Sequence, residues 1–183
     1  MSKAKIYHLV FSTLLAFLLF VGCERSKIAR ELRSFMSTTV TIPDGLVKVE
    51  RGNSLDNTHF GCGPFLVIYH GPEECSTCIL ANNYTDCSYL KRIESTGKCE
   101  VLVIIAPHED DTEAVLDFMR SMNNDFPLYL DQFGNFELLN RSLPVDIRFH
   151  SFLLDENRHP VFVGNPLYSD ALDKLFWKTL ETL

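Results

Sequence analysis

The segment over residues 65–78 most constrains what this chain can fold into. The apolar run Phe65-Leu-Val-Ile-Tyr-His70 is followed by Gly71-Pro72 and then by the cysteine pair Cys75-Ser-Thr-Cys78. Six residues that favour β-structure, ended by Gly-Pro, predict a buried strand that stops at a turn. The sequence therefore predicts a strand, a turn and a helix that begins at two cysteines.

A helix start changes the chemistry of a cysteine. The first-turn N–H groups have no hydrogen-bond partner within the helix, and they lie at the positive end of the helix dipole. The free N–H groups and the dipole both favour a thiolate over a thiol. A thiolate attacks disulfides, and a second thiol one turn away can resolve the mixed disulfide. Cys75, nearest the helix end, is the better exposed and better stabilised of the two. Two alternatives remain: an inert pair or stable disulfide, and a zinc site, although zinc ligand pairs usually come with a second pair and we predict no metal.

Length and charge exclude several classes of function. At 183 residues, with 46% hydrophobic residues, the chain fits one domain with a real core plus a short tether. Its formal net charge is −7 and the sequence has no basic stripe. Nucleic acids and anionic lipid surfaces attract basic proteins, so we predict no binding to either. The sequence has no Gly-rich phosphate loop, and we expect no cofactor.

The N-terminus predicts export. Lys3 and Lys5 precede an apolar stretch from Leu9 to Val21, the layout of a secretory signal. The stretch is about 13 residues, shorter than the roughly 20 that span a bilayer. Its end, Leu19-Phe20-Val21-Gly22-Cys23, resembles a bacterial lipoprotein signal, which implies cleavage before Cys23 and a lipid on its sulfur. An ordinary cleaved signal and an uncleaved short anchor are alternatives, and each places the domain outside the cytoplasm, where disulfides persist.

The remaining pattern alternates strands and helices. Residues 24–37 carry Ile28, Leu32, Phe35 and Met36 at helical spacing, which predicts a short amphipathic helix. Strands are expected over 38–42, 65–70, 101–105 and 127–131, a hairpin over 149–154 and 160–163, helices over 76–94, 111–122, 135–140 and 169–182, and a loop over 52–63. This order favours an α/β sandwich. We divide the chain into a signal over 1–22, a tether and short helix over 23–37, and a domain over 38–183.

Three motifs, taken in order, resemble one known family. The cysteine pair is followed by Phe126-Pro127-Leu-Tyr-Leu-Asp131-Gln-Phe-Gly134 and by Phe152-Leu-Leu-Asp155 with Val161-Phe-Val-Gly164. A buried strand, a cysteine pair at a helix start, a β–α–β crossover, a hairpin and a terminal helix resemble the thioredoxin superfamily. Within it, the chain is similar to extracytoplasmic lipoproteins related to the peroxiredoxin and cytochrome-maturation thioredoxins, over roughly residues 60–182. The resemblance implies a thioredoxin-like three-layer α/β/α sandwich with a central mixed sheet.

The resemblance also implies an activity. Cys75 would be the exposed nucleophile and Cys78 the buried resolving thiol of a thiol-disulfide oxidoreductase. Its partners would be disulfides of exported proteins and a membrane electron donor that resets the pair. A lipid on Cys23 would anchor the protein to the inner or outer membrane.

Three residues depart from the family pattern. Alignment of Ser151-Phe152-Leu-Leu-Asp155 with the hairpin strand puts His150 where the family has a cis-proline. A protonated histidine beside the pair would lower a thiol pKa. Alternatively, His150 could bind a metal together with the cysteines, or it could simply be a surface residue. Glu74, next to Glu73, opposes a thiolate, so we expect a mildly reducing or exchange role rather than a strong oxidant. Tyr69 replaces a buried acid. The Glu74 and His150 departures favour a second hypothesis, a redox-silent binding or assembly module.

The other cysteines allow two pairings. If Cys23 carries a lipid, five cysteines remain, so at least one is free or pairs between molecules. Cys62 and Cys99 each precede a strand, and these two strands would be parallel neighbours in the fold. A Cys62–Cys99 disulfide is therefore possible, and Cys87–Cys99 is its competitor.

Overall fold

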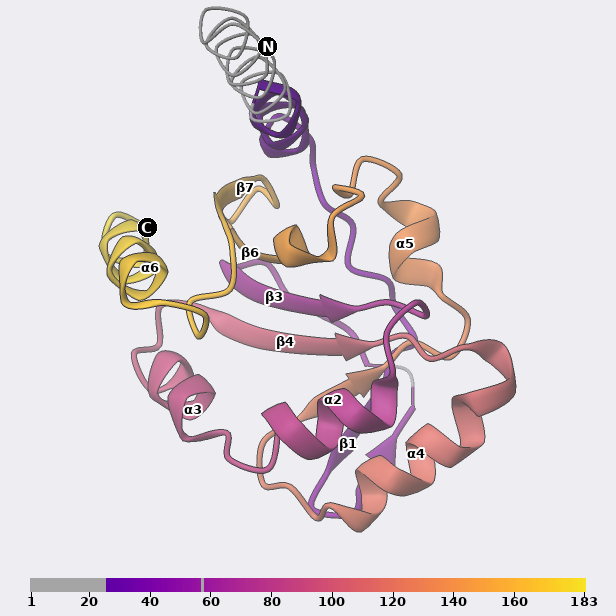
Figure 1. The fold of residues 1–183 in the computed structure, drawn as a ribbon. Coiled ribbons are helices and arrows are strands. Elements are labelled where there is room, and N and C mark those ends of the chain that lie inside the picture. The colour runs from indigo at the N-terminus through magenta and orange to yellow at the C-terminus, as the bar shows by residue number, and fades with distance from the viewer. Residues whose placement is uncertain (1–25, 57) are drawn as a thin grey trace, which may run out of the picture.

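The computed structural model describes residues 26–56 and 58–183 (Figure 1). The predicted signal over 1–22 and the predicted lipidation site, Cys23, lie outside the described residues. The described chain forms one seven-stranded sheet in the order β2-β1-β5-β4-β3-β6-β7. The strands are β1 (Val47–Glu50), β2 (Asn53–Leu55), β3 (Phe65–His70), β4 (Glu100–Ile105), β5 (Leu128–Leu130), β6 (Ser151–Leu154) and β7 (Pro160–Val163).

The sheet is mixed, as predicted. β3 pairs with β4 in parallel over its whole length, from Phe65 opposite Glu100 to His70 opposite Ile105. β4 and β5 are also parallel, whereas β1, β2, β6 and β7 join by antiparallel pairing. All six residues of β3 are buried, because a central strand is covered on both faces.

Helices cover both faces of the sheet, which confirms the three-layer sandwich. Leu66 and Ile68 of β3 point to one face and Phe65 and Val67 to the other, following the two-residue repeat of a strand. Helices α2, α3, α4 and α6 pack on the first face, and α5 packs on the second (Figure 1). Phe35, near the end of the helix over residues 26–36, joins the core on the second face. The helices are α2 (Ser76–Asn83), α3 (Ser88–Glu94), α4 (Thr112–Ser121), α5 (Asn135–Leu139) and α6 (Asp170–Glu181).

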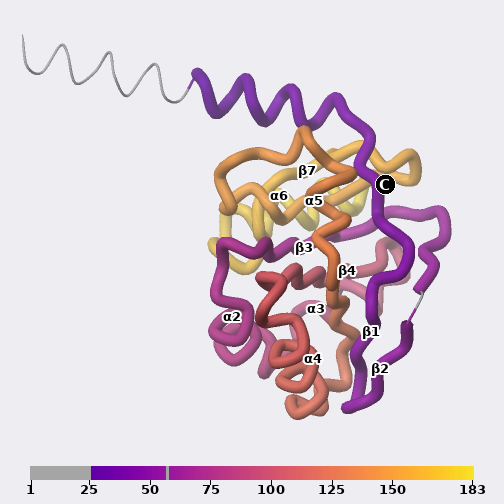
Figure 2. The backbone as a smooth tube through the Cα atoms, turned by 90° about the vertical axis from the view of Figure 1, so that its right-hand side faces the viewer, coloured from indigo at the N-terminus to yellow at the C-terminus, as the bar shows by residue number. Residues whose placement is uncertain are grey.

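The predicted N-terminal helix is present over residues 26–36 and projects from the domain (Figure 2). Phe35 attaches it to the core, because its side chain is fully buried and its ring centroid lies 5.0 Å from that of Phe152. The carboxylate of Glu31 accepts a hydrogen bond of 2.7 Å from the backbone N–H of Val145. No helix in the described part of the chain is long and apolar enough to cross a membrane.

The strand predicted over 38–42 is absent, and the first strand, β1, begins after the turn at Asp44-Gly45. The buried amide of Asn140 explains the difference, since its Oδ1 accepts from the Thr41 N–H and its Nδ2 donates to the Thr41 carbonyl, both at 2.8 Å. The N–H of Val40 donates to the carbonyl of Arg158 at 2.9 Å. This segment is therefore held by distant residues instead of a neighbouring strand.

Three further predictions were wrong in detail. The expected loop over 52–63 contains β2, which forms a hairpin with β1 through a turn at Arg51-Gly52, where φ is 51° and 73°. The helix expected over 76–94 is divided into α2 and α3, and the carboxylate of Asp86 accepts from the first N–H of α3, at Ser88, at 2.8 Å. The helical spacing of apolar residues over 169–182 also predicts that Leu175 of α6 faces inward, but its side chain is exposed.

Candidate active site

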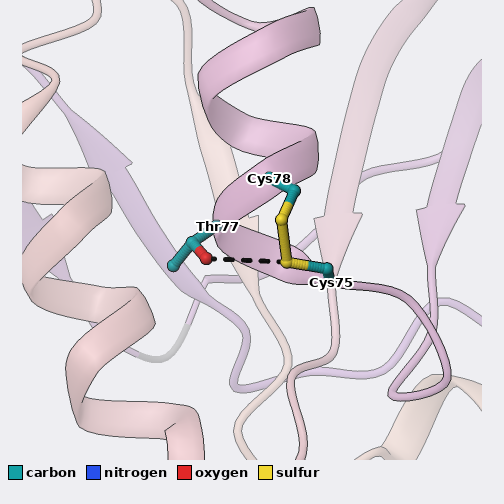
Figure 3. Close-up of a disulfide and its surroundings, with 3 residues drawn as sticks. All are labelled: Cys75, Thr77 and Cys78. Atoms are coloured by element: carbon teal, nitrogen blue, oxygen red, sulfur yellow. Dashed lines mark hydrogen bonds between the residues drawn. A yellow bond between two sulfur atoms is a disulfide. The ribbon is translucent and has the colours of Figure 1, made fainter.

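The cysteine pair lies where the sequence predicts it, at the start of the helix that follows β3. The turn after β3 is closed by a hydrogen bond from the Glu74 N–H to the Gly71 carbonyl at 3.1 Å. Cys75 is the N-cap residue of α2. A disulfide joins Cys75 to Cys78, with their Cα atoms 5.3 Å apart (Figure 3).

Both cysteines are exposed, so the expectation of a buried Cys78 was wrong. The buried face of α2 is formed by Ser76 and Leu80. Each helical residue is rotated by about 100° from the one before, so Cys78 lies about 200° from Ser76 and faces solvent. The disulfide is therefore open to a reaction partner at either sulfur.

Polar groups at the start of α2 favour a negative charge on Cys75. No side chain caps this end of the helix, so its first N–H groups are not taken by a side-chain acceptor. The hydroxyl of Thr77 lies 3.8 Å from Sγ of Cys75 and is the donor, since a disulfide sulfur carries no hydrogen (Figure 3). After reduction, the same groups can donate to a thiolate.

Glu74 is held by its neighbours. Its carboxylate lies 3.3 Å from Nδ1 of His70 and accepts from the Gly71 N–H at 3.2 Å. Burial raises the pKa of Glu74, but the hydrogen bond and charge of His70 and the Gly71 N–H outweigh it and leave the pKa below its ordinary value. The carboxylate next to Cys75 is therefore ionised and fixed in place.

His70 and Tyr84 complete this arrangement, and the sequence reasoning missed their role. His70 is buried, and its Nε2 lies 2.8 Å from the hydroxyl of Tyr84, which is buried at the end of α2. The available signal was a histidine closing an otherwise apolar strand. Its partner Tyr84 could not be identified, because that contact depends on where α2 ends.

Tyr69 lies on the opposite face of β3 from α2. Its hydroxyl donates to the carboxylate of Glu137 in α5 at 3.3 Å. Burial raises the pKa of Tyr69, and the negative charge of Glu137 raises it further. Tyr69 therefore stays protonated and cannot replace the buried carboxylate of the family pattern as a proton acceptor.

His150 lies beside Tyr69, with ring centroids 5.6 Å apart. Its Nε2 donates to the carbonyl of Pro144 at 2.8 Å, and its Nδ1 is buried without a hydrogen-bond partner in the described structure. Residues 26–56 and 58–183 contain no cis peptide bond, so the peptide bond before His150, which the sequence alignment sets at the family's cis-proline, is trans.

A groove of about 660 Å³ runs beside the pair, between the turn after β3 and α5. Its lining includes Glu74 and His150, the acidic Glu137, and the exposed apolar side chains of Phe133 and Val145. A smaller adjoining hollow is lined by Pro72, Cys75 and Thr77, and Pro72 also lines the groove. A polypeptide chain can thus approach Cys75 along a partly apolar, acidic surface.

The other described cysteines are free thiols, so neither expected structural disulfide is formed. Cys62 is exposed, whereas Cys87 and Cys99 are buried. Cys99 directly precedes the central strand β4, its sulfur accepts a hydrogen bond from the Leu66 N–H, and burial raises its pKa to about 11. The described residues contain no group of three or more His, Cys, Asp or Glu side chains that could hold a metal ion.

Comparisons with known proteins give similarity in structure alone. No protein-family model and no curated protein sequence matches the chain. One similar solved structure is a thioredoxin-like protein from Porphyromonas gingivalis, 15% identical, covering 79% of this chain and 93% of that one with a TM-score of 0.44. A thiol:disulfide interchange protein DsbE from Chlorobium tepidum is 14% identical over 79% and 98%, with a TM-score of 0.48. The thioredoxin domain of a thiol-disulfide oxidoreductase from Bacteroides vulgatus is 17% identical over 78% and 98%, with a TM-score of 0.46.

The chain's own topology decides the fold. A buried strand β3 leads into α2 at the cysteine pair, and a crossover returns to the parallel strand β4. An antiparallel hairpin of β6 and β7 follows on the other side of β3, and α6 ends the chain. This is the order of elements expected from the sequence, and the chain has the thioredoxin-like fold.

Proposed function

We propose that this protein is an extracytoplasmic, membrane-tethered thiol-disulfide oxidoreductase. The observation that carries the proposal is the exposed Cys75–Cys78 disulfide at the uncapped start of α2. A dithiol at this position has its first thiol stabilised as a thiolate and its second within reach of the first. The adjoining groove supplies a surface for the polypeptide that carries the target disulfide.

The exchange takes two steps. In the reduced protein, the Cys75 thiolate attacks one sulfur of a substrate disulfide, which forms a mixed disulfide and releases the other substrate sulfur as a thiolate. The Cys78 thiolate then attacks Sγ of Cys75, forms the intramolecular disulfide and releases the substrate as a dithiol. The two electrons now held by the substrate must be replaced, and we assign that task to a membrane electron donor.

The carboxylates beside the pair support a reducing or exchange role. Glu73 is exposed and Glu74 is ionised next to Cys75, and negative charge disfavours a thiolate. Strong oxidants of this type depend on a highly stabilised thiolate in their reduced form. The substrates are accordingly disulfides of exported proteins that need reduction or rearrangement.

Substitution of the nucleophile tests the activity. We expect Cys75→Ser to abolish reduction of insulin disulfides in the presence of dithiothreitol, because no thiolate remains at the helix start. Cys78→Ser should instead accumulate a mixed disulfide, visible on a non-reducing gel. Cys62→Ser, at an exposed free thiol, is the matched control and should keep the wild-type rate. A Cys75→Ser protein that still reduces insulin would refute the assignment.

The redox-silent binding module is supported by one observation, the replacement of the cis-proline by His150 without a cis bond. Thiol trapping distinguishes the two functions. If the protein is an enzyme, a mild reductant should open the Cys75–Cys78 disulfide, and exposure to air should form it again. A pair that stays locked until the protein unfolds would identify the binding module.

The tether is tested separately. The sequence predicts a lipid on Cys23, and the helix over 26–36 would then connect that lipid to the domain. We expect Cys23→Ser to move the protein from the membrane fraction to the soluble exported fraction, and to remove incorporation of labelled palmitate. Unchanged membrane association without palmitate would instead support an uncleaved anchor.

A further inference from the structure

A buried hydrogen-bonded chain runs beneath the cysteine helix. His70 ends β3 on the face that α2 covers, since it shares that face with Leu66 and Ile68. Its Nδ1 lies 3.3 Å from both carboxylate oxygens of Glu74, and its Nε2 lies 2.8 Å from the hydroxyl of Tyr84. Glu74 precedes the first residue of α2 by two positions and Tyr84 follows its last, so one imidazole is bonded to both ends of the helix.

The hydrogen positions follow from the partners. A carboxylate only accepts, so Nδ1 of His70 carries a hydrogen and donates it to Glu74. The Tyr84 hydroxyl donates to Nε2 when the imidazole is neutral and accepts from it when the imidazole is charged, so the contact is kept in either state. Burial raises the pKa of Tyr84, which keeps this donor protonated. Every side-chain nitrogen and oxygen atom of His70, Glu74 and Tyr84 thereby has a hydrogen-bond partner.

Other groups do not replace these contacts. His150 acts on Glu74 through its charge, and Cys87 and Tyr168 act on Tyr84 in the same way. The only further hydrogen bond to the Glu74 carboxylate in the described structure comes from the Gly71 N–H. Loss of His70 would therefore leave the Glu74 side chain attached at one oxygen and able to turn toward the neighbouring sulfur.

We propose that His70 and Tyr84 are positioning residues for the reduced enzyme: they hold the Glu74 carboxylate against β3 and so limit the effect of its charge on the thiolate of Cys75. The inference rests on the proposed function, since it assigns the contacts that tune the same nucleophile. Two like charges a few ångströms apart at a partly exposed site repel strongly enough to shift a pKa by about one unit. That shift corresponds to about a tenfold change in the acid constant of the thiol.

The test measures the thiol pKa of Cys75 from the pH dependence of its alkylation rate. The protein carries Cys62→Ser and Cys78→Ser so that Cys75 is the only exposed cysteine of the described chain. His70→Phe should raise the thiol pKa by about one unit. Glu74→Gln removes the charge that His70 restrains, so adding His70→Phe to Glu74→Gln should change the pKa by less than a third as much.

Tyr84→Phe keeps the ring and removes only the hydroxyl, which guards against misfolding of the His70 variant. It should raise the thiol pKa in the same direction by a smaller amount. Tyr89→Phe is the matched control, because the Tyr89 hydroxyl is likewise hydrogen bonded, in its case to the carboxylate of Asp173. It should leave the thiol pKa unchanged.

Two results would overturn the proposal: an unchanged thiol pKa in His70→Phe, or an equal shift with and without Glu74→Gln, which indicates a purely structural role. The proposed function fails by a different result. If Cys75→Ser still reduces insulin, Cys75 is not the nucleophile, whereas the coupling between His70 and Glu74 is read from alkylation and needs no turnover.

Discussion

At the scale of single residues, the carboxylate of Asp131 fixes the start of α5 and hence one wall of the groove. The side chain is buried, and its two oxygens accept from the N–H groups of Asn135 at 3.0 Å and Phe136 at 2.8 Å. Both N–H groups belong to the first turn of the helix, where no backbone partner exists. Asp131 therefore caps α5 from four residues away.

We expect Asp131→Ala to lower the free energy of unfolding by about 1–3 kcal/mol, because a cap is lost and buried N–H groups lose their acceptors. Urea denaturation monitored by circular dichroism measures the change. Gln132→Ala, at the next position along the turn, is the control and should have little effect. An Asp131→Ala protein as stable as wild type would show that solvent satisfies these N–H groups.

The residue scale also shows where sequence reasoning about the site succeeded. The identity and position of Cys75 and Cys78 were readable, because a strand, a Gly-Pro turn and a helix start are local features. The exposure of Cys78 could not be predicted from the sequence, because it depends on which face of α2 meets the sheet. The contact of His70 with Tyr84 was hidden for the same reason, as it joins residues across the whole length of α2.

At the scale of elements, the turn between β1 and β2 depends on one glycine. Gly52 has φ +73°, a conformation that side chains with a Cβ rarely adopt, and a Cβ there would lie 3.4 Å from the carbonyl oxygen of Arg120. The hairpin was missed in the sequence because β2 is only three residues long and fully exposed, so it has no apolar pattern.

Gly52→Ala should therefore destabilise the protein by about 1 kcal/mol, with a lower melting temperature in calorimetry. Gly61→Ala is the matched control. Its added Cβ would meet no atom within 4 Å and its backbone does not require a positive φ, so its melting temperature should stay close to that of wild type. Equal melting temperatures for both variants would contradict this account of the turn.

The elements that the sequence predicted well carry their own signal. β3 and β4 each contain a continuous apolar run, and α4 and α6 repeat apolar residues at helical spacing. The segment over 38–42 was misread because β-branched residues favour a strand wherever they stand, whereas its actual partners, Asn140 and Arg158, are about 100 residues away in the chain. Such side-chain pairing leaves no pattern in the local sequence.

At the scale of the whole molecule, the buried thiols make the stability of the fold decrease as the pH rises into the alkaline range. Burial raises the pKa of Cys99 to about 11, and burial also raises the pKa of Cys87. In the unfolded chain a thiol ionises near pH 8.5. A group whose pKa is higher in the folded state contributes stability that is complete below its unfolded pKa and is lost as pH rises toward its folded pKa.

The urea midpoint of the wild-type protein should accordingly fall between pH 8 and pH 10.5. Cys99→Ala removes one of these thiols, so the same pH change should lower its midpoint by less than it lowers the wild-type midpoint. Cys62→Ser, at an exposed cysteine, should follow the wild-type curve. If the urea midpoints of Cys99→Ala and wild type fall equally with pH, the buried thiol of Cys99 does not contribute to the loss of stability at alkaline pH.

The ends of the sheet have a consequence for how copies of this protein coexist. β2, at one end, has three exposed residues, and β7, at the other, begins with Pro160, which has no N–H to offer. An edge strand that is short or begins with proline offers a second molecule few free backbone groups through which to extend the sheet. If copies are gathered on one membrane, as the proposed lipid on Cys23 would bring about, they should therefore not join through their sheets, and each sulfur pair should stay open to substrates rather than to neighbouring copies.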